Sequence, residues 1–447
     1  MTRGIAGIAG YLPYYRVERK AIAAMYGGGG GKGTRAAASF DEDATTLAFA
    51  AASAALHSAP GVSPETLWFA TTTPPYLDKS NASAVHSALG LAPSVSAFDA
   101  IGSVRSAMGA LRAAVDSSRP TLVATGDLRS GRPNSADESF GGDAGAAVLV
   151  CSDTDAPLIA EIIGWGTTTE DILDQWRTPG ASFTKHWEER FGEELYETAL
   201  ATAWADALKD AGIDSVDRVL VAGTNARSNT VISKKFGEAA GDPLLNTIGN
   251  TAAAHPLLSL ALALETAEPG STIALVVLSD GVEVAIFKVN AQVPAVLGPN
   301  LAGKRSLEYG KFLTWREMLP VEPPKRPEPG RTSASAAARS AAWKFGFQAS
   351  VDDGEVHLPP RPGATERRPM GETLGTVATF TIDRLSYSQS PPLVFAVIDF
   401  DGGGRFPMEL TDVSADEVEI GMRVKPTFRR LFTIDGIHNY FWKATPA

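Results

Sequence analysis

Short apolar runs alternate with amphipathic segments along residues 1–292. Runs of four to eight apolar residues favour strands, and apolar positions repeated every three or four residues favour helices. Because strands and helices alternate, the pattern predicts a layered α/β fold. The predicted strands are 66–73, 121–127, 144–152, 217–224, 271–280 and 282–289, and the predicted helices include 43–57, 104–116 and 194–211.

One further helix, predicted over 252–266, differs from the others. From Pro256 to Leu264 it carries no charge and is apolar on every side. Such a helix is buried all round, and it is too short to cross a membrane, so it belongs at the centre of a large core. With the helix at 104–116 it forms a central pair whose N-termini we expect to face one cleft. Helix N-termini offer unpaired N–H groups, which suit a developing oxyanion.

The pattern changes after residue 292. Residues 293–340 are interpreted as an extension and linker, because 318–340 is rich in Pro, Ser, Ala and charge. Short strands follow, and five of them in so short a stretch predict a small β-barrel of OB type over 341–447. These strands are predicted at 375–383, 393–400, 405–412, 418–432 and 438–444.

Composition narrows the class of protein. A length of 447 residues suits two or three domains. The net charge of −11 argues against nucleic-acid binding. No window is apolar enough for a membrane span, and residues 1–25 lack the features of a secretory signal, so we expect a cytoplasmic protein. Cys151, the single cysteine, follows an apolar run and is interpreted as a small buried side chain.

Three stretches carry a resemblance to known enzymes. TIGNTAAAHPLLSLALALE (247–265), DEDATTLAFAAASAAL (41–56) and GGDAGAAVLV (141–150) are similar to segments of hydroxymethylglutaryl-CoA synthases and ketoacyl-ACP synthases III. The last 140 or so residues resemble the OB-fold proteins that accompany thiolase-like enzymes. The resemblance implies a five-layered thiolase-like fold with two similar halves, about 1–160 and 161–292, and a C-terminal OB-fold β-barrel. It also implies a CoA thioester as substrate and a homodimer.

The position of the catalytic cysteine in these families is occupied differently here. Counting from Phe98, or back from Leu111, the nucleophile position falls on Val104, which forms no thioester but is expected to point at the substrate. Ser103 is one residue away. It is either a turn residue or a hydrogen-bond donor to a thioester oxygen.

The proton-transfer positions also depart from the family pattern. Thr72 occupies the position of the synthases' glutamate base, and Asn225 is the nearest polar residue to their histidine. Asn250, in the Gly-Asn-Thr turn, is the family residue that is retained. His255, at the entry of the apolar helix, is either a general acid or base facing the cleft or a histidine bonded to nearby backbone.

Several other residues are candidates for binding rather than catalysis. Tyr76 either lines the substrate pocket or packs beside two prolines. Arg227, Lys234 and Lys235 either meet CoA phosphates or are solvated. The segment 176–196 is predicted to be a lid or a dimer-facing insertion. In the C-terminal domain, 346–368 takes the place of a zinc ribbon but has no cysteine, so we expect no metal there.

Three functions remain after these observations. The first is an enzyme that makes or cleaves a carbon–carbon bond next to a CoA thioester by non-covalent aldol or retro-aldol chemistry. The second is a condensing acyltransferase with an unconventional nucleophile. The third is a non-catalytic acyl-CoA-binding or scaffold protein.

Overall fold

The computed structural model describes residues 2–188, 190–242, 244–322 and 342–447. The chain divides into two compact units. Unit 1 comprises Met1–Ala38, Asp43–Ala82 and Pro93–Tyr309, and unit 2 comprises Ser39–Glu42, Ser83–Ala92 and Gly310–Ala447. In the described ranges, no helix has the length and apolar character needed to span a membrane.

The first half of unit 1 contains β1 (Arg3–Tyr11), β2 (Tyr15–Glu18), α1 (Arg19–Met25), β3 (Thr34–Ala37), α2 (Ala44–Ser58), β4 (Thr66–Thr71), α3 (Ala82–Ala88, which continues into unit 2), β5 (Ser96–Ile101), α4 (Arg105–Asp116), β6 (Thr121–Leu128), α5 (Ala136–Phe140) and β7 (Asp143–Ser152). The second half contains β8 (Ala160–Thr169), β9 (Gln175–Trp176), β10 (Lys185–His186), α6 (Arg190–Ala211), β11 (Arg218–Gly223), α7 (Ala226–Lys235), η1 (Gly237–Ala239), η2 (Ala252–Ala254), α8 (His255–Leu264), β12 (Thr272–Leu278), β13 (Gly281–Val289), α9 (Leu297–Asn300) and β14 (Arg305–Ser306).

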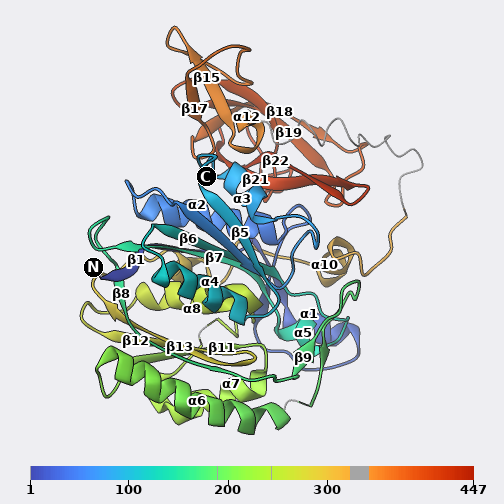
Figure 1. Ribbon diagram of the computed structural model, residues 1–447. Helices are drawn as coiled ribbons and strands as arrows, with labels where there is room; N and C mark the ends of the chain where they lie inside the picture. Colours follow the sequence, from blue (N-terminus) through green and yellow to red (C-terminus); the bar gives the residue numbers. More distant parts are fainter. Residues whose placement is uncertain (1, 189, 243, 323–341) are drawn as a thin grey trace. The chain divides into compact units, whose positions relative to one another are not determined.

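Nine strands of unit 1 form one continuous ladder in the order β11-β12-β13-β8-β1-β7-β6-β4-β5. The join between its halves is short, because β1 and β8 pair through only Gly4 and Ile5. Strand β4 runs parallel to β5 and β6, and β11 runs parallel to β12. Figure 1 shows this ladder as two sheet layers, one from each half of the unit.

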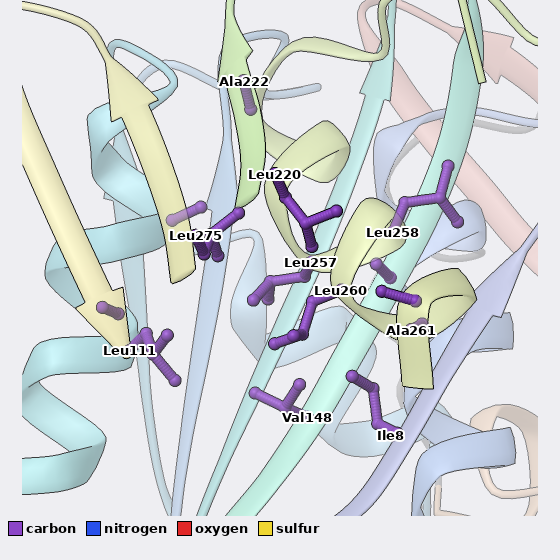
Figure 2. Close-up of a cluster of buried hydrophobic side chains, with 14 of the residues drawn as sticks. Ile8, Leu111, Val148, Leu220, Ala222, Leu257, Leu258, Leu260, Ala261 and Leu275 are labelled. Carbon is purple, nitrogen blue, oxygen red and sulfur yellow. The ribbon is translucent and has the colours of Figure 1, made fainter. Parts of the chain in front are cut away.

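The central layer consists of α4 and α8, which lie between the two sheet layers in Figure 1. All ten residues of α8 are buried. Figure 2 shows its leucines between side chains of the two layers: Ile8 and Val148 on one side, Leu220 and Leu275 on the other. The prediction of a helix that is apolar all round and buried at the centre of the core is confirmed.

The outer layers are α2 on the first-half sheet and α6 with α7 on the second-half sheet. Both long helices lie close to the strands because glycines face them. A Cβ added to Gly145 would lie 2.2 Å from the Leu47 carbonyl oxygen of α2, and one added to Gly166 would lie 1.9 Å from the Ala203 oxygen of α6. The five-layered α/β/α/β/α arrangement expected from the sequence is confirmed.

Unit 2 contains most of α10 (Tyr309–Trp315) and a sheet in the order β20-β19-β18-β21-β22. Its strands are β18 (Gly375–Asp383), β19 (Leu393–Phe400), β20 (Arg405–Glu409), β21 (Arg423–Ile434) and β22 (Ile437–Pro446), so the five predicted strands are confirmed. A bridge between Leu410 and Ala444 brings the end of β20 onto β22, as in a small barrel. The predicted linker residues 323–340 lie outside the described residues.

The segment predicted as a ribbon without cysteines forms β15 (Gln348–Asp352), β16 (Glu355–His357) and β17 (Arg367–Pro369), after the short helix α12 (Ala342–Phe345). Its folded form depends on packing and hydrogen bonds. Phe347 stacks on Trp442 with ring centroids 5.3 Å apart, and the Trp442 indole donates to the Phe345 carbonyl at 2.8 Å. Within the described ranges, no group of three or more His, Cys, Asp or Glu side chains has the arrangement of a metal site.

A cluster of buried charges also lies in unit 2. Lys443 Nζ is 2.9 Å from Asp41 Oδ2 and 2.6 Å from Glu409 Oε1. The Arg429 guanidinium is 3.1 Å from Asp41 Oδ1 and 2.6 Å from Asp412 Oδ2. Asp41 belongs to the short segment Ser39–Glu42, more than 360 positions away from these partners in the sequence. We call these five side chains the ion cluster.

Candidate functional site

A cavity of about 470 Å³ opens at the carboxyl ends of five strands of unit 1. Part of its lining lies at the ends of the parallel strands β4, β5 and β6 of the first half and β11 and β12 of the second half, and much of the rest comes from the β9–β10 hairpin. Ligands of open α/β sheets bind outside the carboxyl ends of parallel strands, where loops are free to present side chains. The cavity is therefore the candidate active site, and both halves contribute to it.

The turn between β5 and α4 forms one wall. Ile101, Gly102 and Ser103 line the cavity, and Gly102 has φ +140°, which a side chain would resist. Ser103 accepts a backbone hydrogen bond from Ser106 at the start of α4. Val104, the next residue, is buried in the core among α4 and its neighbours and is not one of the lining residues. The serine of the turn thus faces the cavity, and the valine faces the core.

The wall after β4 is fixed by one buried carboxylate, Asp127 at the end of β6. Its Oδ1 accepts hydrogen bonds from the hydroxyls of Thr71, Thr72 and Thr73 at 2.7–3.1 Å, and also from the Thr72 N–H. Its Oδ2 accepts from the Ala253 N–H at 2.7 Å, at the entry to α8. Burial raises the pKa of Asp127, although these donors oppose the shift. Asp127 therefore holds Thr72 and Thr73 in the cavity wall.

The opposite wall belongs to the second half and includes Asp174, just before β9. Its Oδ2 accepts the Tyr196 hydroxyl at 3.0 Å, and the Asn225 side chain also hydrogen-bonds to it. Burial raises the pKa of Asp174, and the nearby Asp280 adds to the shift. Burial likewise raises the pKa of Tyr196, with Asp174 contributing. A carboxyl group whose pKa is raised toward neutrality suits proton transfer.

A third group of charges lies around Asp137 on α5. Arg129 and His186 both contact this carboxylate, and the His186 Nε2 lies 2.6 Å from Oδ2. Burial alone would raise the pKa of Asp137, but His186 and Arg129 hold it below its usual value. The hydrogen bond to Asp137 raises the pKa of His186. This contact attaches the β9–β10 hairpin to α5.

Asn250 and His255 lie outside the set of residues that line the cavity. The Asn250 side chain donates to the Gly223 carbonyl at 2.6 Å and accepts from the Ala252 N–H, so it ties the end of β11 to η2. His255 is 1% exposed, and its Nε2 lies 2.7 Å from Asp242 Oδ2. Its Nδ1 accepts from the Thr251 N–H. Both ring nitrogens of His255 are thus engaged inside the protein.

The remaining predicted residues are distributed as follows. Thr72 and Ser103 line the cavity. Asn225 caps α7 by accepting from the Ser228 N–H, next to the lining residue Thr224. Arg227 pairs with Glu193 and Lys235 with Glu197, on the exposed face of α6 and α7, where Lys234 is also exposed. Two predicted residues have other surroundings: the Tyr76 ring lies under Lys79, and Cys151 is fully buried on β7.

Four titratable residues of the site were not predicted from the sequence: Asp137, Asp174, Asp280 and His186. The proposed lid segment 176–196, chosen for Trp176, Trp187 and Phe191, did point to the region of His186. Asp280 follows the predicted strand β12, so its position at the carboxyl end of a strand could have marked it as a candidate site residue. Asp137 lies on the five-residue helix α5 and Asp174 lies in an irregular segment, so no periodic pattern marks either of them.

The layers, the sheet order and the barrel define the class of protein: a thiolase-like domain followed by an OB-fold domain. Residues 357–429 match the family model of the ChsH2 C-terminal OB-fold domain. The crystal structure of an HMG-CoA synthase complexed with CoA has a TM-score of 0.59 with 21% identity, covering 70% of this chain and 89% of that one. The 3-oxoacyl-(acyl carrier protein) synthase III of Pseudomonas aeruginosa has a TM-score of 0.58 with 18% identity, covering 66% and 100%.

Curated relatives give the same result at the level of sequence. The chain is 26% identical over 316 residues to the hydroxymethylglutaryl-CoA synthase of Thermococcus gammatolerans, covering 67% of this chain and 90% of that protein. It is also 26% identical over 350 residues to the enzyme of that name from Methanopyrus kandleri, covering 71% and 97%. The resemblance inferred from the sequence is therefore confirmed: the chain is similar to enzymes of the thiolase superfamily.

Proposed function

We propose that this protein is an acyl-CoA-dependent enzyme that makes or cleaves a carbon–carbon bond next to a CoA thioester without forming an acyl-enzyme. One observation carries the proposal. Among the described residues that line the cavity there is no cysteine, whereas three aspartates line it, one of them with a raised pKa. Aldol chemistry requires an acid–base group and an oxyanion site but no covalent nucleophile.

The roles follow from the walls of the cavity. The turn before α4 directs the start of a helix at the space, and N–H groups there suit the oxygen of a thioester enolate. Thr72 and Thr73, fixed by Asp127, present a polar wall for the hydroxyl-bearing part of the substrate. Arg227, Lys234 and Lys235 are retained as candidates for the CoA phosphates, although two of them already pair with glutamates. No metal has a role in this proposal.

A second candidate function is a condensing acyltransferase, favoured by the position of Ser103 on the cavity wall. A serine becomes a nucleophile when an adjacent base accepts its proton. Among the described residues no side chain hydrogen-bonds to the Ser103 hydroxyl, and His255, the base considered from the sequence, is enclosed elsewhere. This geometry favours the non-covalent chemistry over the acyltransferase. The third candidate, a non-catalytic acyl-CoA-binding scaffold, predicts binding of acyl-CoA without turnover.

The proposal is tested with a panel of 3-hydroxyacyl-CoA thioesters and with acyl-CoA alone. We expect release of a carbonyl compound and a shortened acyl-CoA, and an unchanged protein mass after incubation with acyl-CoA. A stable mass increase equal to one acyl group would establish the acyltransferase instead. Binding of acyl-CoA without turnover in either direction would establish the scaffold function.

The Ser103→Ala variant is expected to retain most of the activity. The serine contributes at most one hydrogen bond to the substrate, so the loss is limited to about 1–3 kcal/mol of activation free energy. The variant is compared with the original protein by kcat/KM. Complete loss of turnover, together with an acyl group mapped to the peptide that contains Ser103, would contradict the proposal.

We also propose that the protein is cytoplasmic and forms a homodimer. The homodimer is expected because the families that the chain resembles pair through the sheet of the thiolase-like core. In this chain the edge strand β5 exposes Phe98 and Ile101. We expect light scattering at micromolar concentration to give twice the chain mass of 46.9 kDa. A single-chain mass under these conditions would contradict it.

A further inference from the structure

A second cavity of about 330 Å³ lies beside the candidate active site, and Asp174 lines both. The second cavity is mainly apolar, because Ile172, Leu173, Trp187 and Leu195 supply most of its wall. Leu173, Trp187 and Leu195 are 56%, 55% and 44% exposed, respectively. Large apolar side chains gathered at this exposure are typical of a binding surface rather than of ordinary solvated surface. The two cavities thus differ in polarity and share one carboxylate.

The β9–β10 hairpin determines this division. Asp174 directly precedes β9 and Trp187 directly follows β10, and the Trp187 N–H donates to the Asp174 carbonyl at 2.9 Å. Beyond Asp174, the residues Gln175–Arg177 line the larger cavity. Before it, Ile172 and Leu173 line the smaller one. The carboxylate lies at the boundary, where its Oδ2 is held by the Tyr196 hydroxyl.

Resting on the proposed function, we propose that Asp174 is its acid–base residue and that the substrate is a 3-hydroxyacyl-CoA with an apolar group on C3. The thioester portion occupies the larger, polar cavity. The apolar group occupies the smaller cavity, against Leu173, Trp187 and Leu195. Asp174 then lies between the two parts, beside the C3 hydroxyl group that connects them.

The cleavage step balances with these groups alone. The Asp174 carboxylate accepts the proton of the C3 hydroxyl, and the C3–O bond becomes a carbonyl as the C2–C3 bond breaks. The electron pair of that bond passes to C2 and forms the thioester enolate. The protonated Asp174 returns its proton to C2, which gives the shortened acyl-CoA and restores the carboxylate. The released fragment is an apolar aldehyde or ketone.

The surroundings of Asp174 support a role in proton transfer. Burial, followed by the charge of Asp280 on the loop after β12, raises its pKa, while the Tyr196 hydroxyl of α6 and the Asn225 amide oppose the shift. His186 on β10 also interacts electrostatically with Asp174. We therefore expect the acidic limb of kcat/KM against pH to lie above the usual carboxyl range of about 4. A base with a pKa nearer the working pH is the more effective catalyst.

The test compares the original protein with Asp174→Asn and with the matched control Asp171→Asn, an exposed aspartate three positions earlier. With a 3-hydroxyacyl-CoA that carries an alkyl chain on C3, we expect Asp174→Asn to lower kcat by about 100-fold or more. It should change KM by less than about threefold, because the contacts that bind the substrate equally well in the ground state and in the transition state are retained. Asp171→Asn should match the original protein. Exchange of the C2 hydrogens of the shortened acyl-CoA with D₂O should be lost in Asp174→Asn only.

A second variant tests the apolar cavity. Leu195→Gln, on an exposed part of α6, is expected to raise KM about tenfold for long alkyl substituents and to leave a methyl substituent unaffected, because only the long chain reaches this wall. The melting temperatures of all the variants are measured to verify folding. Cleavage by Asp174→Asn at the original rate would overturn this inference and leave the proposed function intact. Absence of cleavage by the original protein with every substrate would overturn both.

Discussion

Substituting Asp41 by Asn is expected to lower the free energy of unfolding of the protein by about 3–5 kcal/mol. The Asp41 carboxylate forms ion pairs with both cations of the ion cluster, Lys443 and Arg429. It also accepts a hydrogen bond from the Thr411 hydroxyl at 3.0 Å. The amide has a similar shape but no charge. It leaves two buried cations with one carboxylate fewer, and a buried charge without its partner is costly.

The measurement is denaturant unfolding of the full chain, followed by fluorescence, with Asp399→Asn as the control. Asp399 pairs with Arg405 through side chains that are 47% and 65% exposed, in the same unit. An exposed pair contributes less than about 1 kcal/mol, so the control should unfold with the original protein. Equal, small effects of the two substitutions would show that solvent reaches the ion cluster.

The same carboxylate gives an expected pH dependence. Burial alone would raise the pKa of Asp41, but Lys443 and Arg429 outweigh it and lower the pKa from 3.8 to about 2. A carboxyl group with a lowered pKa in the folded state stabilises the protein fully above its unfolded value. This contribution is lost as the pH falls from about 4 to about 2. The free energy of unfolding is measured against pH for the original protein and for Asp41→Asn. The difference between the two curves from about pH 4 to about pH 2 gives the contribution of this carboxylate.

The second large effect is expected for Asp127→Asn. The two carboxylate oxygens of Asp127 accept five hydrogen bonds in the interior of unit 1, and an amide has only one oxygen with which to accept them. Either the threonines after β4 or the Ala253 N–H then faces an NH₂ group. Each buried donor left without an acceptor costs about 1–3 kcal/mol. We also expect weaker binding of acyl-CoA, because Thr72 and Thr73 lose their fixed positions in the cavity wall.

The control for this prediction is Asp217→Asn. Asp217 also accepts from a threonine hydroxyl and a backbone N–H, both of Thr272 at 2.8 Å, but these bonds are exposed. Water replaces what the substitution removes, so the stability should change by less than about 1 kcal/mol. Thermal unfolding and acyl-CoA titration of both variants check the prediction. An unaltered Tm for Asp127→Asn would mean that its donors find other acceptors.

The parts of the fold that the sequence predicted well are those with a strong local pattern. After His255, the residues of α8 carry no charge and are all apolar except Ser259, and a helix of that kind is buried on every side. The strand β7 was evident for the same reason. The strands β1 and β8 were missed, because glycines interrupt their apolar pattern. Those glycines, such as Gly7 and Gly166, are needed where a helix backbone approaches the sheet, and only the assembled layers reveal that.

The candidate site was less predictable because its contacts join distant segments. Comparison with the family pattern drew attention to Thr72 and Ser103, and both line the larger cavity. His255 was favoured as a polar residue at the entry of an apolar helix. Its position depends on Asp242, 13 residues earlier in an irregular segment, and no periodicity relates the two. Asp174 meets its partners only once the β9–β10 hairpin has formed, and Asp137 meets its partners only once α5 has formed.

The origin of Asp41 in the N-terminal part of the chain limits how the C-terminal barrel can be recombined. Unit 2 is not a single stretch of sequence, because it includes Ser39–Glu42, which precede the first long helix. A gene fragment that starts after Tyr309 would produce Lys443 and Arg429 without two of their acidic neighbours, Asp41 and Glu42. Exchange of this domain between proteins therefore requires replacement of Ser39–Glu42 together with the C-terminal stretch, and a single crossover before Gly310 does not achieve that.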